Sequence, residues 1–157
     1  MQFYIRFLKM GLLLSGLVLL SACHDAPMSG SGATSASPTL EPARIARGAE
    51  VFRQSCANCH GDRAQGAFNW TKPGPDGKYL PPPLNGSAHS WHHPFAQLKQ
   101  TIQEGTLRLG GSMPPWKGRL SEADTEAVIL YFQSLWPVEI YQAWADMDRR
   151  ARLESAK

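Results

Sequence analysis

The pentapeptide Cys56-Ala57-Asn58-Cys59-His60 constrains this chain more than any other stretch, because it holds two of the three cysteines in 157 residues. A structural zinc site needs four ligands, usually with a second pair at short spacing, and the chain has no second cysteine pair. One of His89, His92 and His93 would have to complete the set. A thioredoxin-like dithiol normally follows a strand, and no clean alternation of apolar residues indicates a strand here.

Covalent haem attachment uses all three reactive residues of this motif. C-x-x-C-H is the attachment signature of c-type haem. Cys56 and Cys59 then add to the two vinyl groups, and His60 supplies an imidazole to the iron. We therefore predict one covalently bound haem c, with Cys56 and Cys59 as anchors and His60 as an axial ligand. The cysteine that remains is Cys23.

The start of the chain has the pattern of a secretory signal. Arg6 and Lys9 precede an apolar run over residues 11–20, which ends in Ser21-Ala22-Cys23. This run is short for a transmembrane helix, which needs about 20 apolar residues. The stretch Leu20-Ser21-Ala22-Cys23 resembles the lipobox of bacterial lipoproteins, which implies a signal peptide over residues 1–22 and a lipid on Cys23. An ordinary signal peptide with a cysteine nearby by coincidence is the alternative.

Charge and composition define the next segment and exclude one class of partner. Cleavage before Cys23 removes Arg6 and Lys9, which lowers the basic residues from 16 to 14 against 13 acidic ones. This near-neutral balance excludes the strongly basic face expected of a nucleic-acid-binding protein. Residues 23–41 are rich in Ser, Gly, Ala and Pro and poor in large apolar side chains, so we predict a flexible tether there.

Helical spacing predicts an all-α domain over residues 42–137, followed by an extension over residues 138–157. The expected helices cover residues 42–56 and 94–105 and a third segment that follows Ser121 and is ended by Pro137, and the extension is expected to form one more. In the third of these, Ser121 and Asp124 resemble a capping box, and the apolar stripe consists of Val128, Tyr131, Phe132 and Leu135. In the extension, Ile140, Trp144 and Met147 follow one side; this side either packs on the domain or binds a partner.

Met113 is the methionine best placed to be the second axial ligand. Met1 and Met10 fall in the predicted signal peptide, Met28 in the tether and Met147 in the extension. Met113 lies between Gly110-Gly111 and Pro114-Pro115. Glycines allow the backbone to approach a flat ring closely, and prolines stiffen it. A merely buried loop methionine is the alternative.

Taken together, residues 42–136 resemble a class I cytochrome c. The resemblance is carried by the attachment motif with Gly61, Gly66, the segment Leu80-Pro81-Pro82-Pro83-Leu84-Asn85-Gly86, and the loop Ser112-Met113-Pro114-Pro115-Trp116. It implies an all-α fold with three to four core helices around the haem. It also implies that Gly48 and Phe52 let the first helix cross the last one against Tyr131. A carbonyl of Pro81, Pro82 or Pro83 would accept the His60 ring N–H, and Trp70, Trp91 or Trp116 would contact a haem propionate or simply pack.

Two axial protein ligands leave iron no open position, so the expected role is a monohaem electron carrier rather than an enzyme with a small-molecule substrate. We expect it on the periplasmic side of a bacterial membrane, anchored through its lipid, with redox partners in a respiratory complex, oxidase or reductase. Two alternatives remain. One is a haem-based sensor in which Met113 is displaced. The other is a copper-handling or oxidase-assembly role for the cluster of His89, His92 and His93.

Overall fold

A computed structural model describes residues 41–157, and this part of the chain is all-α as predicted. Its helices are α1 (Pro42–Ser55), α2 (Ala57–His60), α3 (Phe95–Glu104), α4 (Glu122–Ser134) and α5 (Val138–Ser155), with short 3-10 turns η1 (Ser90–His92) and η2 (Leu107–Leu109). No strand forms within residues 41–157; the only β-type pairings there are isolated bridges. The predicted signal peptide and most of the predicted tether lie outside the described residues.

The helix boundaries follow local chemistry. Pro42 opens α1, where its missing N–H costs nothing. The Ser121 hydroxyl caps α4 by accepting a bond of 3.0 Å from the Asp124 N–H. Helix α4 begins after Ser121 as expected and ends at Ser134, slightly before the predicted stop at Pro137. Leu135 therefore leaves the predicted stripe and is 37% exposed.

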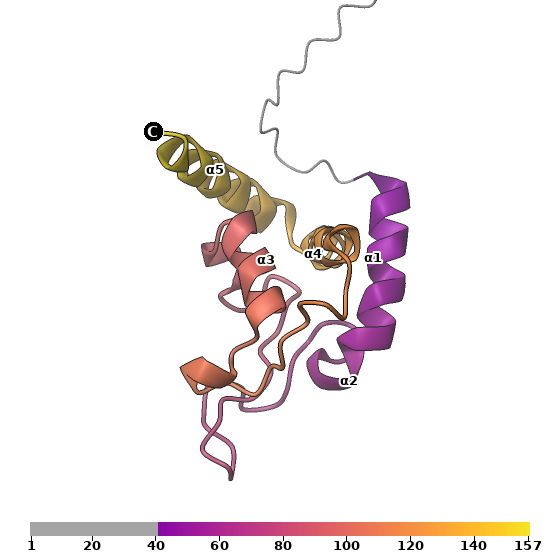
Figure 1. The fold of residues 1–157 in the computed structure, drawn as a ribbon, viewed down its shortest axis with the longest axis vertical. Coiled ribbons are helices and arrows are strands. Elements are labelled where there is room, and N and C mark those ends of the chain that lie inside the picture. The colour runs from indigo at the N-terminus through magenta and orange to yellow at the C-terminus, as the bar shows by residue number, and fades with distance from the viewer. Residues whose placement is uncertain (1–40) are drawn as a thin grey trace, which may run out of the picture. The chain divides into compact units, whose positions relative to one another are not determined.

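The core depends on a close crossing of α1 and α4, which lie side by side in Figure 1. A Cβ atom on Gly48 would lie 2.0 Å from the Ala127 carbonyl oxygen and 2.8 Å from the Tyr131 Cβ. Only glycine permits this approach. One turn further along α1, the Phe52 ring lies 5.2 Å from the Tyr131 ring. The expected roles of Gly48 and Phe52 at this crossing are confirmed.

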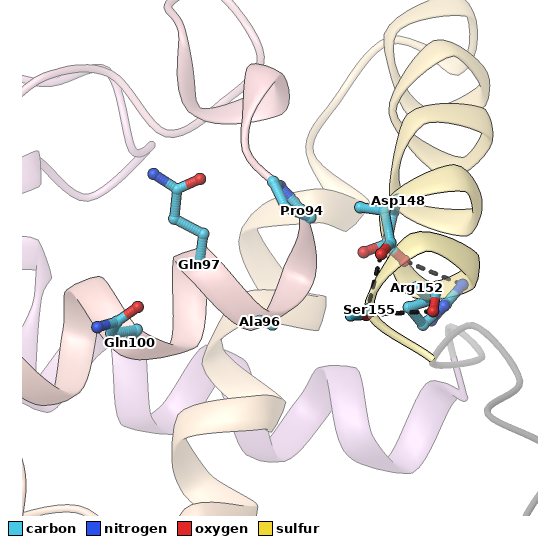
Figure 2. A pocket seen from close by; sticks show the side chains of 8 residues that line it. Pro94, Ala96, Gln97, Gln100, Asp148, Arg152 and Ser155 are labelled. Atoms are coloured by element: carbon cyan, nitrogen blue, oxygen red, sulfur yellow. Dashed lines mark hydrogen bonds and ion pairs between the residues drawn. The ribbon is translucent and has the colours of Figure 1, made fainter. Parts of the chain in front are cut away.

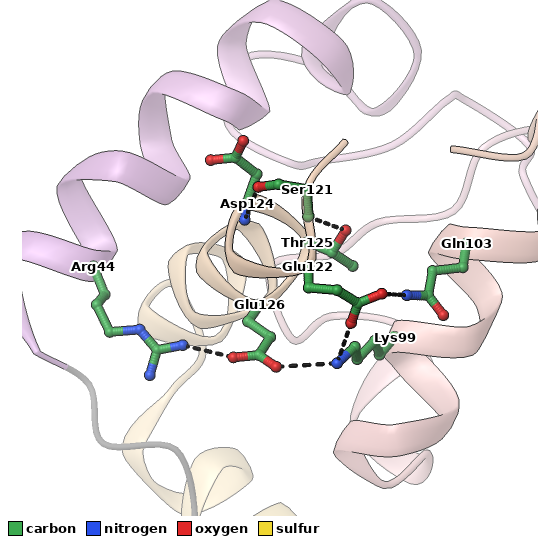
Figure 3. Close-up of polar contacts among 8 residues, drawn as sticks. All are labelled: Arg44, Lys99, Gln103, Ser121, Glu122, Asp124, Thr125 and Glu126. Carbon is green, nitrogen blue, oxygen red and sulfur yellow. Dashed lines mark hydrogen bonds and ion pairs between the residues drawn. The ribbon is translucent and has the colours of Figure 1, made fainter. Parts of the chain in front are cut away.

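Polar side chains tie α1 and α3 to α4 at the surface (Figure 3). Glu126 of α4 accepts from Arg44 of α1 and from Lys99 of α3, both at 3.0 Å. Lys99 also pairs with Glu122, one turn earlier on α4. Partly exposed pairs of this kind contribute roughly 0–1 kcal/mol each. They align the helices, and the apolar contacts supply most of the stability.

The C-terminal extension packs onto the domain, which settles the choice that the sequence left open. Trp144 is fully buried in a cluster with Leu98, Ile129, Phe132 and Trp136, and Ile140 and Met147 pack at its edge. The Trp144 indole N–H donates to the His93 carbonyl at 3.0 Å. Helix α5 thereby holds the segment that leads into α3.

Asp148 of α5 acts as the missing N-cap of α3. Pro94 at the N-cap position has no side chain that accepts a hydrogen bond. Asp148, which is 1% exposed, accepts from the Phe95 N–H at 2.8 Å and pairs with Arg152 at 3.0 Å. A carboxylate at this position accepts a hydrogen bond from an otherwise unpaired N–H, and its negative charge interacts favourably with the positive end of the helix dipole.

The substitution Gly48→Ala tests the crossing. In an open helix it would stabilise by about 1 kcal/mol through helix propensity, but here the new methyl group meets the Ala127 backbone, and we expect a loss of about 3 kcal/mol. Urea unfolding of the haem-loaded protein measures the difference. The substitution Ala46→Gly, at an exposed position of the same helix, measures how much the difference in helix propensity between alanine and glycine contributes to stability. Unchanged or increased stability in Gly48→Ala would contradict the close crossing.

The substitution Asp148→Ala tests the docking of α5. It leaves the Phe95 N–H and the Arg152 guanidinium without this carboxylate in a buried site, so the expected loss is about 2–3 kcal/mol. The control is Asp146→Ala, which removes only an exposed pair with Arg149 and should cost less than about 0.5 kcal/mol. Equal unfolding midpoints for the two variants would show that the cap contributes nothing.

Candidate functional site

Both motif cysteines lie on one tight turn at the end of α1. The Cys56 carbonyl accepts from the N–H of Cys59 at 3.0 Å and of His60 at 2.9 Å. This bonding winds Ala57–His60 into α2 and places residues three apart on one face. Both thiols are free; Cys59 is exposed and Cys56 is half-buried. Burial, with a smaller effect from Cys59, raises the pKa of the Cys56 thiol to about 11.

His60 is buried and held by one hydrogen bond. Its Nδ1 lies 2.8 Å from the Pro82 carbonyl oxygen, and a carbonyl only accepts, so Nδ1 carries the proton. The lone pair of the neutral ring is then on Nε2. Burial lowers the pKa of His60, against a smaller opposing effect of the Pro82 bond. The ring is therefore neutral at pH 7, in the form that binds a metal ion.

The Pro82 carbonyl is itself held by backbone pairing between residues 64–67 and 81–84. The Leu84 N–H donates to the Ala64 carbonyl at 2.8 Å, and the Ala67 N–H donates to the Pro81 carbonyl at 2.9 Å. Gly66 lies between these bonds with φ +71°, and a Cβ there would be 2.4 Å from the Pro83 nitrogen. Gly66 thus allows the backbone around residue 66 to lie close to Pro82 and Pro83.

Met113 is partly buried in a loop fastened to the C-terminal end of α3. The Trp116 N–H donates to the Ile102 carbonyl at 3.1 Å, and the Lys117 N–H donates to the Gln103 carbonyl at 3.0 Å. Gly111 has a second use besides the predicted approach to a ring, which stays a prediction. A Cβ on Gly111 would lie 2.2 Å from the Thr106 hydroxyl oxygen, so this glycine makes room for Thr106.

The segment that contains Pro82, the hydrogen-bond partner of His60, is itself hydrogen-bonded to the loop that contains Met113. The Tyr79 N–H donates to the Gly110 carbonyl at 3.1 Å, and the Ser112 hydroxyl donates to the Tyr79 carbonyl at 3.0 Å. Tyr79 precedes Pro82 by three residues, a span of at most about 10 Å. The sequence showed no sign of this link, because it consists mainly of backbone bonds between distant segments.

The histidine cluster does not form a metal site in the structure. The rings of His89 and His93 meet edge to face at 5.8 Å, whereas His92 turns to Trp91, with ring centroids 3.9 Å apart. Within residues 41–157, no group of three or more His, Cys, Asp or Glu side chains is placed to hold a metal ion. The predicted copper-binding role therefore gains no support from the geometry.

The three tryptophans proposed as propionate contacts each have an ordinary packing partner. Trp70 lies against His89 at 5.5 Å, Trp91 lies against His92, and the Trp116 ring lies under the Arg119 guanidinium at 4.7 Å. The expected contact of one of them with a haem propionate stays a prediction.

A groove of about 390 Å³ lies elsewhere, between α3 and α5 (Figure 2). Its lining includes Pro94, Gln97, Gln100, Asp148, Arg152 and Ser155. None of the predicted haem residues borders it.

Within residues 41–157, no helix is both long enough and apolar enough to cross a membrane.

The side chains around the motif fit a c-type haem. The site offers two free thiols three residues apart, and a buried neutral imidazole whose Nε2 lone pair is available. The Pro82 carbonyl holds this imidazole in the tautomer that a metal ion needs.

Comparison with known proteins agrees with this chemistry. The family model described as "Cytochrome C oxidase, cbb3-type, subunit III" matches residues 43–132. The cbb3-type cytochrome c oxidase subunit CcoP of Azospirillum sp. (strain B510) is 35% identical over 92 residues, which cover 59% of this chain and 29% of that protein. Subunit FixP of Bradyrhizobium sp. (strain ORS 278) is 35% identical over 98 residues, with 62% and 30% covered.

The match is confined to part of each relative. Subunit CcoP of Rhodobacter capsulatus is 36% identical over 103 residues, again with 30% of that protein covered. The chain thus spans about 30% of the length of the curated relatives it matches. No solved structure matches the chain significantly. The family match covers more than half of the chain, so this protein belongs to the c-type cytochrome family that includes subunit III of cbb3-type cytochrome c oxidases.

Proposed function

We propose that this protein carries single electrons through one haem c bound to Cys56 and Cys59, with His60 and Met113 as axial ligands. The observation that carries the proposal is the 2.8 Å bond from His60 Nδ1 to the Pro82 carbonyl. This bond fixes the ring and leaves Nε2 as the ligand atom, which is the usual role of a partner to a metal-binding histidine. The chain has a single C-x-x-C-H motif, which supports one haem.

The chain's own residues would make the site an electron carrier rather than a catalytic centre. When bound, haem supplies an iron that alternates between the ferrous and ferric states. His60 and Met113 together would fill both axial positions, so no position is left for a substrate. A thioether opposite an imidazole also raises the reduction potential. Membership of a c-type cytochrome family supports this role over a ligand-binding sensor.

The partner is proposed from the relatives. Their names describe subunits of cbb3-type cytochrome c oxidases, so we propose that this protein exchanges electrons within a respiratory oxidase complex or with one. We also propose that a lipid on Cys23 anchors it on the periplasmic side of the membrane, through a tether over residues 23–41. Cys23 lies outside the described residues.

Replacing Met113 tests the second ligand. In Met113→Ala the methionine–iron charge-transfer band of the ferric protein should disappear, and the reduction potential of the haem should fall, because the thioether ligand is lost. The spectrum and the haem-to-protein ratio, expected to be one, are measured together. Met147→Ala, on α5, is the matched control and should keep the band. A band that survives in Met113→Ala excludes Met113 as the ligand.

Purification from detergent-solubilised membranes tests the function. A tagged protein should be recovered with a terminal oxidase, and its reduced haem should be oxidised when oxygen is admitted to the purified complex. The variant Cys23→Ala should retain its haem and spectrum but move from the membrane to the soluble fraction. A haem that stays reduced in oxygen beside the co-purified proteins would contradict the proposed electron transfer.

A further inference from the structure

We propose that Thr106 is the positioning residue that holds Met113 at the iron. This inference rests on the proposed role of Met113 as a ligand and adds a residue that the motif does not contain. Thr106 is the second residue after α3, and it lies seven residues before Met113.

Thr106 and Met113 close a loop by bonding to each other twice. The Thr106 N–H donates to the Met113 carbonyl at 2.9 Å. In return, the Met113 N–H donates to the Thr106 hydroxyl Oγ1 at 3.1 Å. Both backbone polar groups of the proposed ligand therefore bond to a single residue, and the Met113 backbone is fixed relative to Thr106.

The hydroxyl takes a role that a backbone carbonyl usually fills. In a hydrogen-bonded antiparallel pair, each residue donates its N–H to the carbonyl of the other. Here the Thr106 carbonyl already accepts from the N–H of Leu109 at 2.9 Å and of Gly111 at 3.0 Å. A carbonyl oxygen has two lone pairs, so these two bonds fill it. The side-chain oxygen is left as the acceptor for Met113.

Two glycines leave the space that this arrangement needs. A Cβ on Gly111 would lie 2.2 Å from the Thr106 Oγ1, and a Cβ on Gly105 would lie 2.6 Å from the Met113 carbonyl oxygen. Gly105 also ends α3, where its N–H donates to the Thr101 carbonyl at 2.9 Å. The pair of Thr106 and Met113 is thus built directly onto the end of a helix.

Loss of this hydroxyl should loosen the ligand without removing it. In Thr106→Val the side chain keeps its shape, but the Met113 N–H loses its acceptor, which should make displacement of Met113 by added imidazole about tenfold easier. Imidazole titration of the ferric haem-loaded protein, followed by loss of the charge-transfer band, gives the dissociation constant. Thr106→Ser keeps the hydroxyl and should stay within about twofold of the wild type.

Thr101→Val is the matched control, because the Thr101 hydroxyl bonds only within α3, to the Gln97 carbonyl at 2.9 Å. It should titrate like the wild type. Equal imidazole affinities in Thr106→Val, Thr106→Ser and the wild type would overturn the proposal, provided that Met113→Ala has lost the band. A band retained in Met113→Ala would overturn the ligand assignment itself, and with it this proposal, so the two failures are distinguishable.

A second measurement needs no variant. In the wild-type haem-loaded protein, the Met113 amide should exchange with deuterium slowly, because its N–H is bonded to the Thr106 hydroxyl. The exposed Ser112 amide, one residue earlier, serves as the internal reference and should exchange faster. Rapid exchange at Met113, equal to that at Ser112, would overturn the proposal even if Thr106→Val failed to fold.

Discussion

The hydrogen bond from His60 to the Pro82 carbonyl is the interaction on which the rest of the site depends. It selects the tautomer that leaves Nε2 unprotonated, and it fixes the orientation of the ring. The carbonyl is in turn fixed by the pairing of residues 64–67 with residues 81–84, which Gly66 permits.

The loops around the site are ordered by backbone hydrogen bonds more than by side-chain packing. Tyr79 connects the proline-rich segment to the loop of Met113, and Thr106 connects that loop to α3. Such an arrangement suits a small domain in which a cofactor replaces part of the apolar core. Backbone bonds such as that from Tyr79 to Gly110 also hold the long segment between α2 and α3, in which η1 is the only helical element.

Helix α5 lies beyond the family match, which ends at residue 132, and yet it belongs to the same core. Trp144 is buried against Trp136 at a ring separation of 5.8 Å, and Asp148 caps α3. The extension therefore stabilises the segment that leads into α3. The Met113 loop lies at the other end of α3, where Thr106 follows the helix.

The sequence by itself determined the chemistry and the helices. The order of Cys56, Cys59 and His60 predicts haem attachment, and helical spacing with local caps such as Ser121 placed α1, α3, α4 and α5 to within a few residues. Only the tertiary structure decided which proline accepts from His60, that Thr106 bonds to Met113, and that His89 meets His93 whereas His92 meets Trp91. The reason is physical: helices and covalent motifs depend on neighbours in the chain, whereas these contacts join segments whose approach depends on the whole fold.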